Sequence, residues 1–535
     1  MRMRAWMCLL AVGLFAWSCG SSVNSGNDAG IDAGHDAGPG GDDEVVDAGE
    51  DAGGGDVAQD AGGGDVAQDA GGADVAQDAG AGDAGEDGGG GGDSGLDAGG
   101  DLGADGGDAG GDFPPLSRAW QWIRTNPMFI SGLTVSAGTP PAQFVNEYFD
   151  DFGANAVHLW QDGLPTEMDA WAAVGNPAFR WVSWTLPGGG SGDGGQLAGG
   201  YPPNSPGRIG YQISDEPRTW EELMDMQVGL AALRAHDPDA LLILNFMFGN
   251  DDLEEMLDTY ATQFEGDIIS YDNYVRSNNS YTRMAIYRDA GLRHGMPYWR
   301  YMDTYMDEDF ENEHDESDLR WDAFSGLVMG FTGHTWFIYQ IDENHSVYPV
   351  LFEHQNDFAA AKTERWHIAA QINREMANLG RAITQLISTD VRYVPTVDLY
   401  LPQGILKWEP GAGGDPYLVA CEREESDWGF EILVGFFRDD AGEIYVMVQN
   451  VSHEHGDFPT NNSDAGVVHL AFDFSDAPAG FDPTSVLNLN KLNGQVETVS
   501  LSPEQDGQRT LDITLAAGDP FLFKYNTGTT FALGL

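Results

Sequence analysis

The stretch RIGYQISDEPRTWEEL, residues 208–223, decides the fold class of this chain. An apolar and aromatic run, residues 208–214, leads directly into Asp215, Glu216 and Pro217, and a helical pattern begins just behind them. A strand that reads as buried, ends on carboxylates and passes at once into a helix is typical of a strand–helix unit with a polar site at its carboxyl end. The chain around it repeats this unit.

Seven further apolar runs have the same form, at residues 128–133, 156–160, 180–185, 241–247, 267–274, 296–305 and 334–340. Helical patterns separate most of them, including residues 219–236, and a final helix is predicted over 361–386. Eight strand–helix units in this order predict a (β/α)8 barrel, which we assign to residues 113–394. A doubly wound sheet is the alternative, but no glycine-rich phosphate loop follows the first strand.

The helical period ends near Val394, and short strands take its place over residues 395–535. The runs FEILVGFF (430–437) and EIYVMVQN (443–450) flank the turn RDDAG, which predicts a hairpin. Further alternating runs follow up to DPFLFKY (519–525). We therefore predict a second, all-β domain with a β-sandwich fold.

The N-terminal residues 1–19 have the form of a secretory signal, with Arg2 and Arg4 before an apolar stretch. The stretch ends at Ser18 and Cys19, which resembles the bacterial lipoprotein box, in which the cysteine is lipidated. The resemblance implies a lipid anchor at Cys19 and a location at the cell surface, outer membrane or periplasm. Ordinary secretion is the alternative.

Residues 20–112 contain 24 acidic residues and no Lys or Arg. They consist mostly of Gly, Ala and Asp, with almost no residues that could form a core, so we predict a disordered, self-repelling tether. The whole chain has a formal net charge of −61. Nucleic acid is excluded as a partner, because phosphate contacts require a basic surface.

Polar and aromatic side chains gather where the predicted barrel strands end, which is the face that holds active sites in such barrels. They are Trp160, Trp184, Asp215, Glu216, Asn245, Asp272, Tyr274, Arg300, Asp303, Trp336 and Tyr339. Carboxylates with several flat rings suit glycosidic cleavage, because one carboxyl protonates the departing oxygen, another acts as nucleophile or base, and rings stack on sugar faces. A carbohydrate is therefore the predicted substrate, with neither a metal nor a cofactor.

The stretch SDEP, residues 214–217, resembles the NEP signature on strand four of a large clan of (β/α)8 glycoside hydrolases that includes many β-galactosidases and β-glucanases. The ending LAAGDPFLFKY, residues 515–525, resembles the β-domains appended to such barrels. The resemblance implies that Glu216 is the general acid/base. It also implies that Asp215 replaces the asparagine that contacts the sugar 2-hydroxyl.

The second catalytic carboxylate departs from the clan, whose nucleophile is a Glu that ends strand seven. The corresponding stretch MPYWRYMDTY, residues 296–305, has no Glu. Asp303 is the nearest substitute on that strand, and Asp272 offers a carboxylate from the adjacent strand. Their distance from Glu216 would distinguish a retaining mechanism, at about 5–5.5 Å, from an inverting one, at about 6.5–9.5 Å.

These observations predict an exported glycoside hydrolase that acts on an extracellular poly- or oligosaccharide. The missing strand-seven Glu keeps an alternative open, a surface carbohydrate-binding or adhesion lipoprotein without catalysis. A metal-dependent hydrolase is less favoured, because no barrel strand carries paired histidines. The acidic stretch 307–318 and the HEHGD stretch 453–457 are interpreted as a solvated loop and a surface turn.

Overall fold

The computed structural model describes residues 116–134, 139–159, 164–184, 201–247, 252–274, 276–306, 315–340, 348–349, 351–354, 357–424, 430–455 and 464–535. The predicted signal, Cys19, the acidic tether and Trp160 lie outside these residues. Among the helices within them, none has the length and apolar character needed to cross a bilayer.

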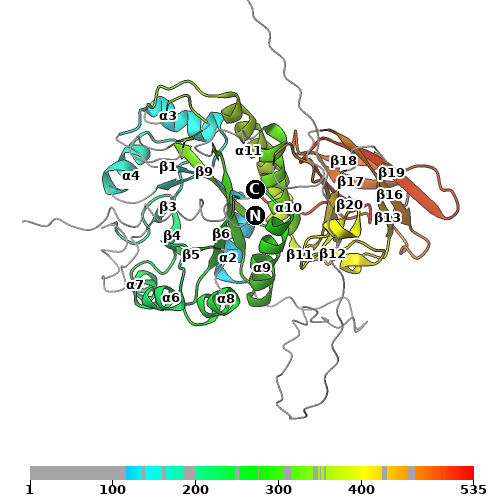
Figure 1. Ribbon diagram of the computed structural model, residues 1–535, viewed down its shortest axis with the longest axis horizontal. Coiled ribbons are helices and arrows are strands. Elements are labelled where there is room, and N and C mark those ends of the chain that lie inside the picture. The colour runs from blue at the N-terminus through cyan, green and yellow to red at the C-terminus, as the bar shows by residue number, and fades with distance from the viewer. Residues whose placement is uncertain are drawn as a thin grey trace, which may run out of the picture. The chain divides into compact units, whose positions relative to one another are not determined.

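Eight parallel strands close into a barrel, with each strand paired to the next in chain order and the last to the first (Figure 1). They are β1 (Phe129–Thr134), β2 (Ala156–Leu159), β3 (Trp181–Trp184), β4 (Arg208–Asp215), β5 (Leu241–Met247), β6 (Ile268–Asp272), β7 (Tyr298–Asp303) and β9 (Gly333–Gln340). The predicted (β/α)8 barrel is confirmed, and all eight predicted strands are present.

Helices surround the barrel strands (Figure 1). They are α2 (Arg118–Thr125), α3 (Ala142–Asn146), the π-helical turn η1 (Glu147–Asp151), α4 (Leu164–Ala173), α6 (Trp220–Asp225), α7 (Gln227–His236), α8 (Leu253–Thr262), α9 (Asn278–His294), α10 (Glu316–Met329) and α11 (Glu364–Ile383). The helix predicted over 219–236 is divided in two at Met226. A small two-stranded sheet, β8 (Tyr305–Met306) with β10 (Tyr348–Pro349), lies after β7 and β9 in the chain.

The C-terminal part contains two packed sheets, which confirms the predicted β-sandwich. The larger sheet has the order β12 (Leu406–Lys407), β11 (Ile387–Val394), β14 (Ile432–Arg438), β15 (Ile444–Asn450), β20 (Pro520–Tyr525), β17 (Ser485–Leu489) and β18 (Val496–Ser500). The smaller one has the order β13 (Leu418–Arg423), β16 (Gly466–Asp473) and β19 (Gln508–Leu515). Cys421, Phe436, Leu470 and Phe523 are among the side chains buried between the sheets.

The boundary between the two folds lies earlier in the chain than predicted. Strand β11 pairs with β14 along its whole length and therefore belongs to the C-terminal sheet. The barrel thus ends with α11, at Ile383, rather than at Val394. Sequence pattern placed the boundary too late because a single strand between a helix and a loop resembles one more barrel strand.

The larger sheet also packs against the barrel, through α10. Leu433, Phe437 and Met447 of the sheet lie in the same buried cluster as the barrel residues of α10. The approach is close: a Cβ on Gly435 would lie 2.2 Å from the Val328 carbonyl oxygen, so only glycine fits there. Every residue of α10 from Ser317 to Met329 is buried, because the helix has barrel strands on one side and the sheet on the other.

Candidate active site

Glu216 follows directly on the last residue of β4, at the carboxyl end of the barrel. Its backbone N–H donates to the Asn245 carbonyl oxygen at 2.9 Å, which continues the pairing of β4 with β5 by one residue. Glu216 has a φ of +47°, a conformation that side chains other than glycine adopt rarely and that is frequent at functional sites. The β4–β5 register shifts between Gln212 and Asp215, and this irregularity places both carboxylates at the strand end.

Asn245 of β5 bridges two carboxylates from neighbouring strands. Its side-chain amide donates to Asp215 Oδ1 at 2.9 Å and to Asp272 Oδ1 at 3.1 Å. The side-chain oxygen Oδ1 of Asn245 accepts a hydrogen bond from the Ser270 hydroxyl at 3.2 Å, which fixes the orientation of the amide. The charge of Glu216 acts on Asp272 as well. Four predicted site residues are therefore brought together.

Burial and neighbouring negative charge keep protons on two carboxyl groups, those of Asp215 and Asp272. Burial raises the pKa of Asp215 to about 7, the charge of Glu216 adds to the effect, and the Asn245 amide opposes it. Burial also raises the pKa of Asp272 well above its ordinary value, and the charge of Glu216 adds to the effect. At neutral pH the cluster therefore holds fewer than three negative charges.

A neutral polar network lies inside the barrel below the carboxylates. The Tyr301 hydroxyl donates to Gln212 Oε1 at 2.7 Å and lies 3.0 Å from His158 Nδ1. The Gln212 amide lies 3.5 Å from Asp215 Oδ1, the outer limit of a hydrogen bond. Burial lowers the pKa of His158 to about 3, so its imidazole is neutral at neutral pH. The network thus supports the acidic cluster without adding a charge.

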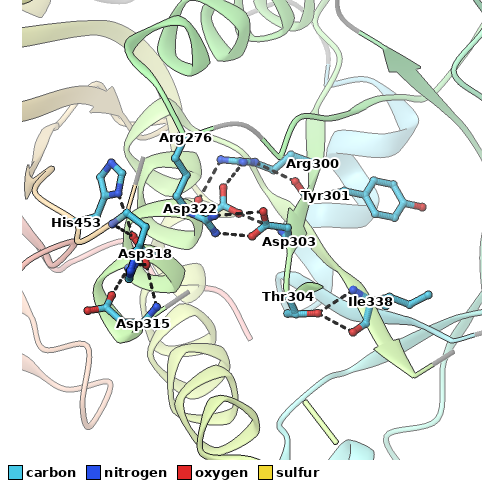
Figure 2. Close-up of polar contacts among 11 residues, drawn as sticks. Arg276, Arg300, Tyr301, Asp303, Thr304, Asp315, Asp318, Asp322, Ile338 and His453 are labelled. Carbon is cyan, nitrogen blue, oxygen red and sulfur yellow. Dashed lines mark hydrogen bonds and ion pairs between the residues drawn. The ribbon is translucent and has the colours of Figure 1, made fainter. Parts of the chain in front are cut away.

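Asp303 ends β7 but is engaged elsewhere. Figure 2 shows its carboxylate directed toward Arg276, on the side of the strand away from the Tyr301 ring. Arg276 Nη1 lies 3.3 Å from Asp303 Oδ2, and Nη2 donates to Oδ1. Burial raises the pKa of Asp303, and the Arg276 guanidinium opposes that rise. Of the two alternatives for the second carboxylate, only Asp272 lies against Glu216.

Three aromatic or cationic residues predicted to bind substrate point outward from the barrel wall into the surrounding helices. Arg300 forms an ion pair with Asp322 of α10. The Trp336 indole N–H donates to Asn373 Oδ1 of α11 at 2.7 Å. All of these side chains are buried, as is Tyr339, whose ring packs against the helix residues Tyr148 and Trp366. They occupy the core between strands and helices and do not reach the carboxylate cluster.

Of the remaining predicted aromatic residues, Tyr274 follows the end of β6 by two residues. Tyr274 is partly exposed and stacks on Phe337 of β9, with ring centroids 5.3 Å apart. Trp184 is the last residue of β3, the strand that precedes β4 in the chain. Trp160 lies outside the described residues. Tyr274 is therefore a partly exposed ring that follows Asp272 closely in the chain.

Sequence reasoning missed His158, Gln212, Tyr301 and Arg276. For Gln212 a signal was present, because a polar residue in the middle of the apolar run 208–214 must find a buried partner. His158 in AVHLW gave the same signal. Arg276 gave none, since its partner Asp303 is distant in the chain and only the fold brings them together.

Two stretches interpreted separately as a loop and a surface turn meet beside α10. Asp315 caps the helix, and Asp318 accepts hydrogen bonds from His453 Nδ1 at 3.1 Å and from His455 Nδ1 at 2.8 Å (Figure 2 shows the first). Burial would raise the pKa of Asp318, but the His453 hydrogen bond and the Arg276 charge hold it below its ordinary value. Asp315, Asp318 and His455 are close enough to hold a cation, yet the carboxylates are already used in capping and histidine contacts.

No protein-family model matches this chain, and no curated protein matches it. Its backbone is similar to that of a glycoside hydrolase family 5 protein from Bacteroides vulgatus, with a TM-score of 0.46, 11% identity, and coverage of 76% of this chain and 92% of that one. For a family 30 xylanase from Clostridium acetobutylicum the TM-score is 0.37 and the sequence identity 11%, with coverage of 75% of this chain and 97% of the xylanase. For a putative α-galactosidase from Bacteroides fragilis the TM-score is 0.40 and the sequence identity 12%, with coverage of 75% of this chain and 79% of that one. Similarity at this level does not identify the activity of this chain.

Replacing Asp215 with Asn is expected to stabilise the protein increasingly as the pH rises from about 4 to about 7. The folded protein keeps a proton on Asp215 up to a pKa of about 7, whereas the unfolded chain loses it near the ordinary value of 3.8. The wild type therefore loses stability across this window, and the variant does not suffer that loss. The measurement is the difference in Tm between the two proteins at a series of pH values. A difference that stays constant from pH 4 to pH 7 would contradict the raised pKa.

Proposed function

We propose that this protein is an exported glycoside hydrolase that cleaves a poly- or oligosaccharide with the carboxyl pair Glu216 and Asp272. The observation that carries the proposal is the carboxyl cluster at the carboxyl end of the barrel, in which Asn245 bridges Asp215 and Asp272. Burial, together with the charge of Glu216, raises the pKa of Asp272 in this cluster. Neighbouring carboxyl groups, at the face where barrels of this kind hold their active sites, are what glycosidic cleavage requires.

A proton transfer between the two groups gives the reactive state. In the resting site the raised pKa of Asp272 favours a proton on that residue. Transfer of this proton to Glu216 leaves Glu216 as the acid and Asp272 as a carboxylate. Glu216 can then protonate the departing glycosidic oxygen, while Asp272 attacks the anomeric carbon or activates water. This division keeps for Glu216 the role that the DEP stretch implies.

The proximity of the pair favours retention of anomeric configuration. Inverting enzymes leave about 6.5–9.5 Å between their carboxyl groups so that a water molecule fits between attacking group and sugar. The electrostatic interaction between Glu216 and Asp272 favours the shorter separation of retaining enzymes, about 5–5.5 Å. We therefore assign Asp272 the role of nucleophile, with a covalent glycosyl–enzyme intermediate that water later hydrolyses.

Export and anchoring are part of the same proposal. The signal-like residues 1–19 and the acidic segment 20–112 support a lipoprotein held at Cys19 and separated from the membrane by its tether. Such an arrangement suits a polymeric substrate outside the cell. Metabolic labelling with a fatty-acid analogue tests the anchor, and a Cys19→Ala variant that still takes up label would contradict it.

The activity is tested by incubating the protein with a panel of neutral and acidic polysaccharides and measuring the release of reducing ends. We expect hydrolysis of at least one class, with the first product formed in the same anomeric configuration as the bond cleaved, as followed by ¹H NMR. Inverted product would contradict the assignment of Asp272 as nucleophile. Binding to a glycan without release of reducing ends would favour the second candidate, a surface carbohydrate-binding protein.

A further inference from the structure

The segment that follows β6 is fastened at three points just beyond Asp272. The Asn273 amide donates to the Ser280 hydroxyl of α9 at 3.1 Å. The Tyr274 ring stacks on a phenylalanine of β9. Arg276 forms its ion pair with Asp303 at the end of β7. The segment therefore has contacts with a helix and with both strands that follow β6 in the barrel.

The ion pair is deeply buried. The side chains of Arg276 and Asp303 are 5% and 3% exposed, and both carboxylate oxygens of Asp303 accept from the guanidinium. A buried charge that loses its partner has no water to replace it, so removing either member alone strongly perturbs the surroundings. Removing both charges together avoids that penalty. This asymmetry makes the pair testable.

The geometry points to a positioning role for Asp303 and Arg276: their ion pair fixes the end of β6 so that the Asp272 carboxyl stays against Glu216. The inference rests on the proposed function, and it gives Asp303 a role different from that of a nucleophile. Asp303 is directed toward Arg276, beside α10 (Figure 2). It acts on the reaction only through the place in which it holds Asp272.

Two variants separate positioning from direct participation, Asp303→Asn and the double variant Arg276→Met with Asp303→Asn. The single variant removes the charge of Asp303 from a buried guanidinium, which keeps only the charges of Asp318 and Asp322 nearby, and it should let the β6 end shift. We expect kcat to fall on the order of 10²-fold, as misplacement of a catalytic group by about 1 Å does, with KM nearly unchanged. The double variant removes the guanidinium together with the carboxylate and should recover on the order of tenfold of that loss.

A direct role predicts the opposite result. If Asp303 attacked the sugar, the double variant would be as slow as the single one, on polysaccharide and on nitrophenyl glycosides alike, and the positioning role would be overturned. Asp237→Asn is the matched control, because Arg208 and Asp237 form an equally buried ion pair whose Arg lies at the opposite end of β4. This control should lower Tm and leave kcat close to the wild-type value.

Hydrogen–deuterium exchange provides a measurement that does not depend on activity. Backbone amides of residues 268–280 should exchange faster in Asp303→Asn and return toward the wild-type rate in the double variant. Unchanged exchange in the single variant would overturn the positioning role. If the wild-type protein cleaved no glycan while the two variants showed the expected exchange pattern, the proposed function alone would be contradicted. The positioning role would remain intact.

Discussion

Replacing Glu216 with Gln is expected to lower the rate of polysaccharide cleavage on the order of 10²–10⁴-fold, the usual contribution of general acid catalysis. The amide keeps the size of the side chain and its capacity to hydrogen-bond, but it cannot give a proton to the departing oxygen. The loss should be smaller for nitrophenyl glycosides, because nitrophenolate departs with little protonation. The measurement is kcat/KM on both substrate types.

Glu221→Gln is the matched control for this variant, since Glu221 is exposed in the first turn of α6, a few residues further along the chain. It should cleave at the wild-type rate. A Glu216→Gln variant that also cleaves polysaccharide at that rate would remove Glu216 from the mechanism and favour the carbohydrate-binding alternative.

Replacing Asp272 with Asn is expected to have the larger effect, on the order of 10⁴–10⁶-fold, as the loss of a nucleophile commonly does. The asparagine amide cannot form the covalent intermediate, so the loss should be as great for nitrophenyl glycosides as for polysaccharide. This substrate independence distinguishes Asp272 from Glu216, and it is measured with the same two substrates. Asp267→Asn is the control, because Asp267 is a buried carboxylate just before the opposite end of β6, bound to Arg118 and Arg234.

An Asp272→Asn variant that keeps most of its activity on nitrophenyl glycosides would contradict the nucleophile role. A variant that lost activity only because it failed to fold would be recognised by its circular dichroism and its Tm. We expect it to fold, because Asn245 can still hydrogen-bond to the asparagine carbonyl oxygen, and because the raised pKa of Asp272 means that the folded protein already accommodates an uncharged group there.

The fold could be predicted because each level of the sequence pointed to the same answer. The strand runs carried their own turn and helix signals, and their order left few topologies. The α10 pattern was less informative: this helix is buried on every side, so it has no polar stripe that would mark a solvent face. The end of the barrel was misplaced for a related reason, since β11 is recognised as part of a second sheet only through its pairing with β14.

The candidate site could be predicted in part. Position at a strand end correctly selected Asp215, Glu216, Asn245 and Asp272 as neighbours, because parallel strands in a barrel bring their carboxyl ends to one face. The same rule could not distinguish the inward direction from the outward one. Trp336 and Tyr339 follow the rule and yet pack against helices, since side chains alternate along a strand and the register near its end is irregular. Asp303 was ambiguous until the fold brought Arg276 to it.

The backbone of Glu216 has a consequence for how this protein could change. A φ of +47° is the region where glycine is the least costly residue, so the fold would be more stable with no side chain at this position. Selection for thermal stability alone would therefore tend to remove the carboxylate, and selection for turnover would tend to keep it. A stabilised descendant obtained by blind screening would be most at risk of losing its chemistry at this one residue, while its barrel remained unchanged.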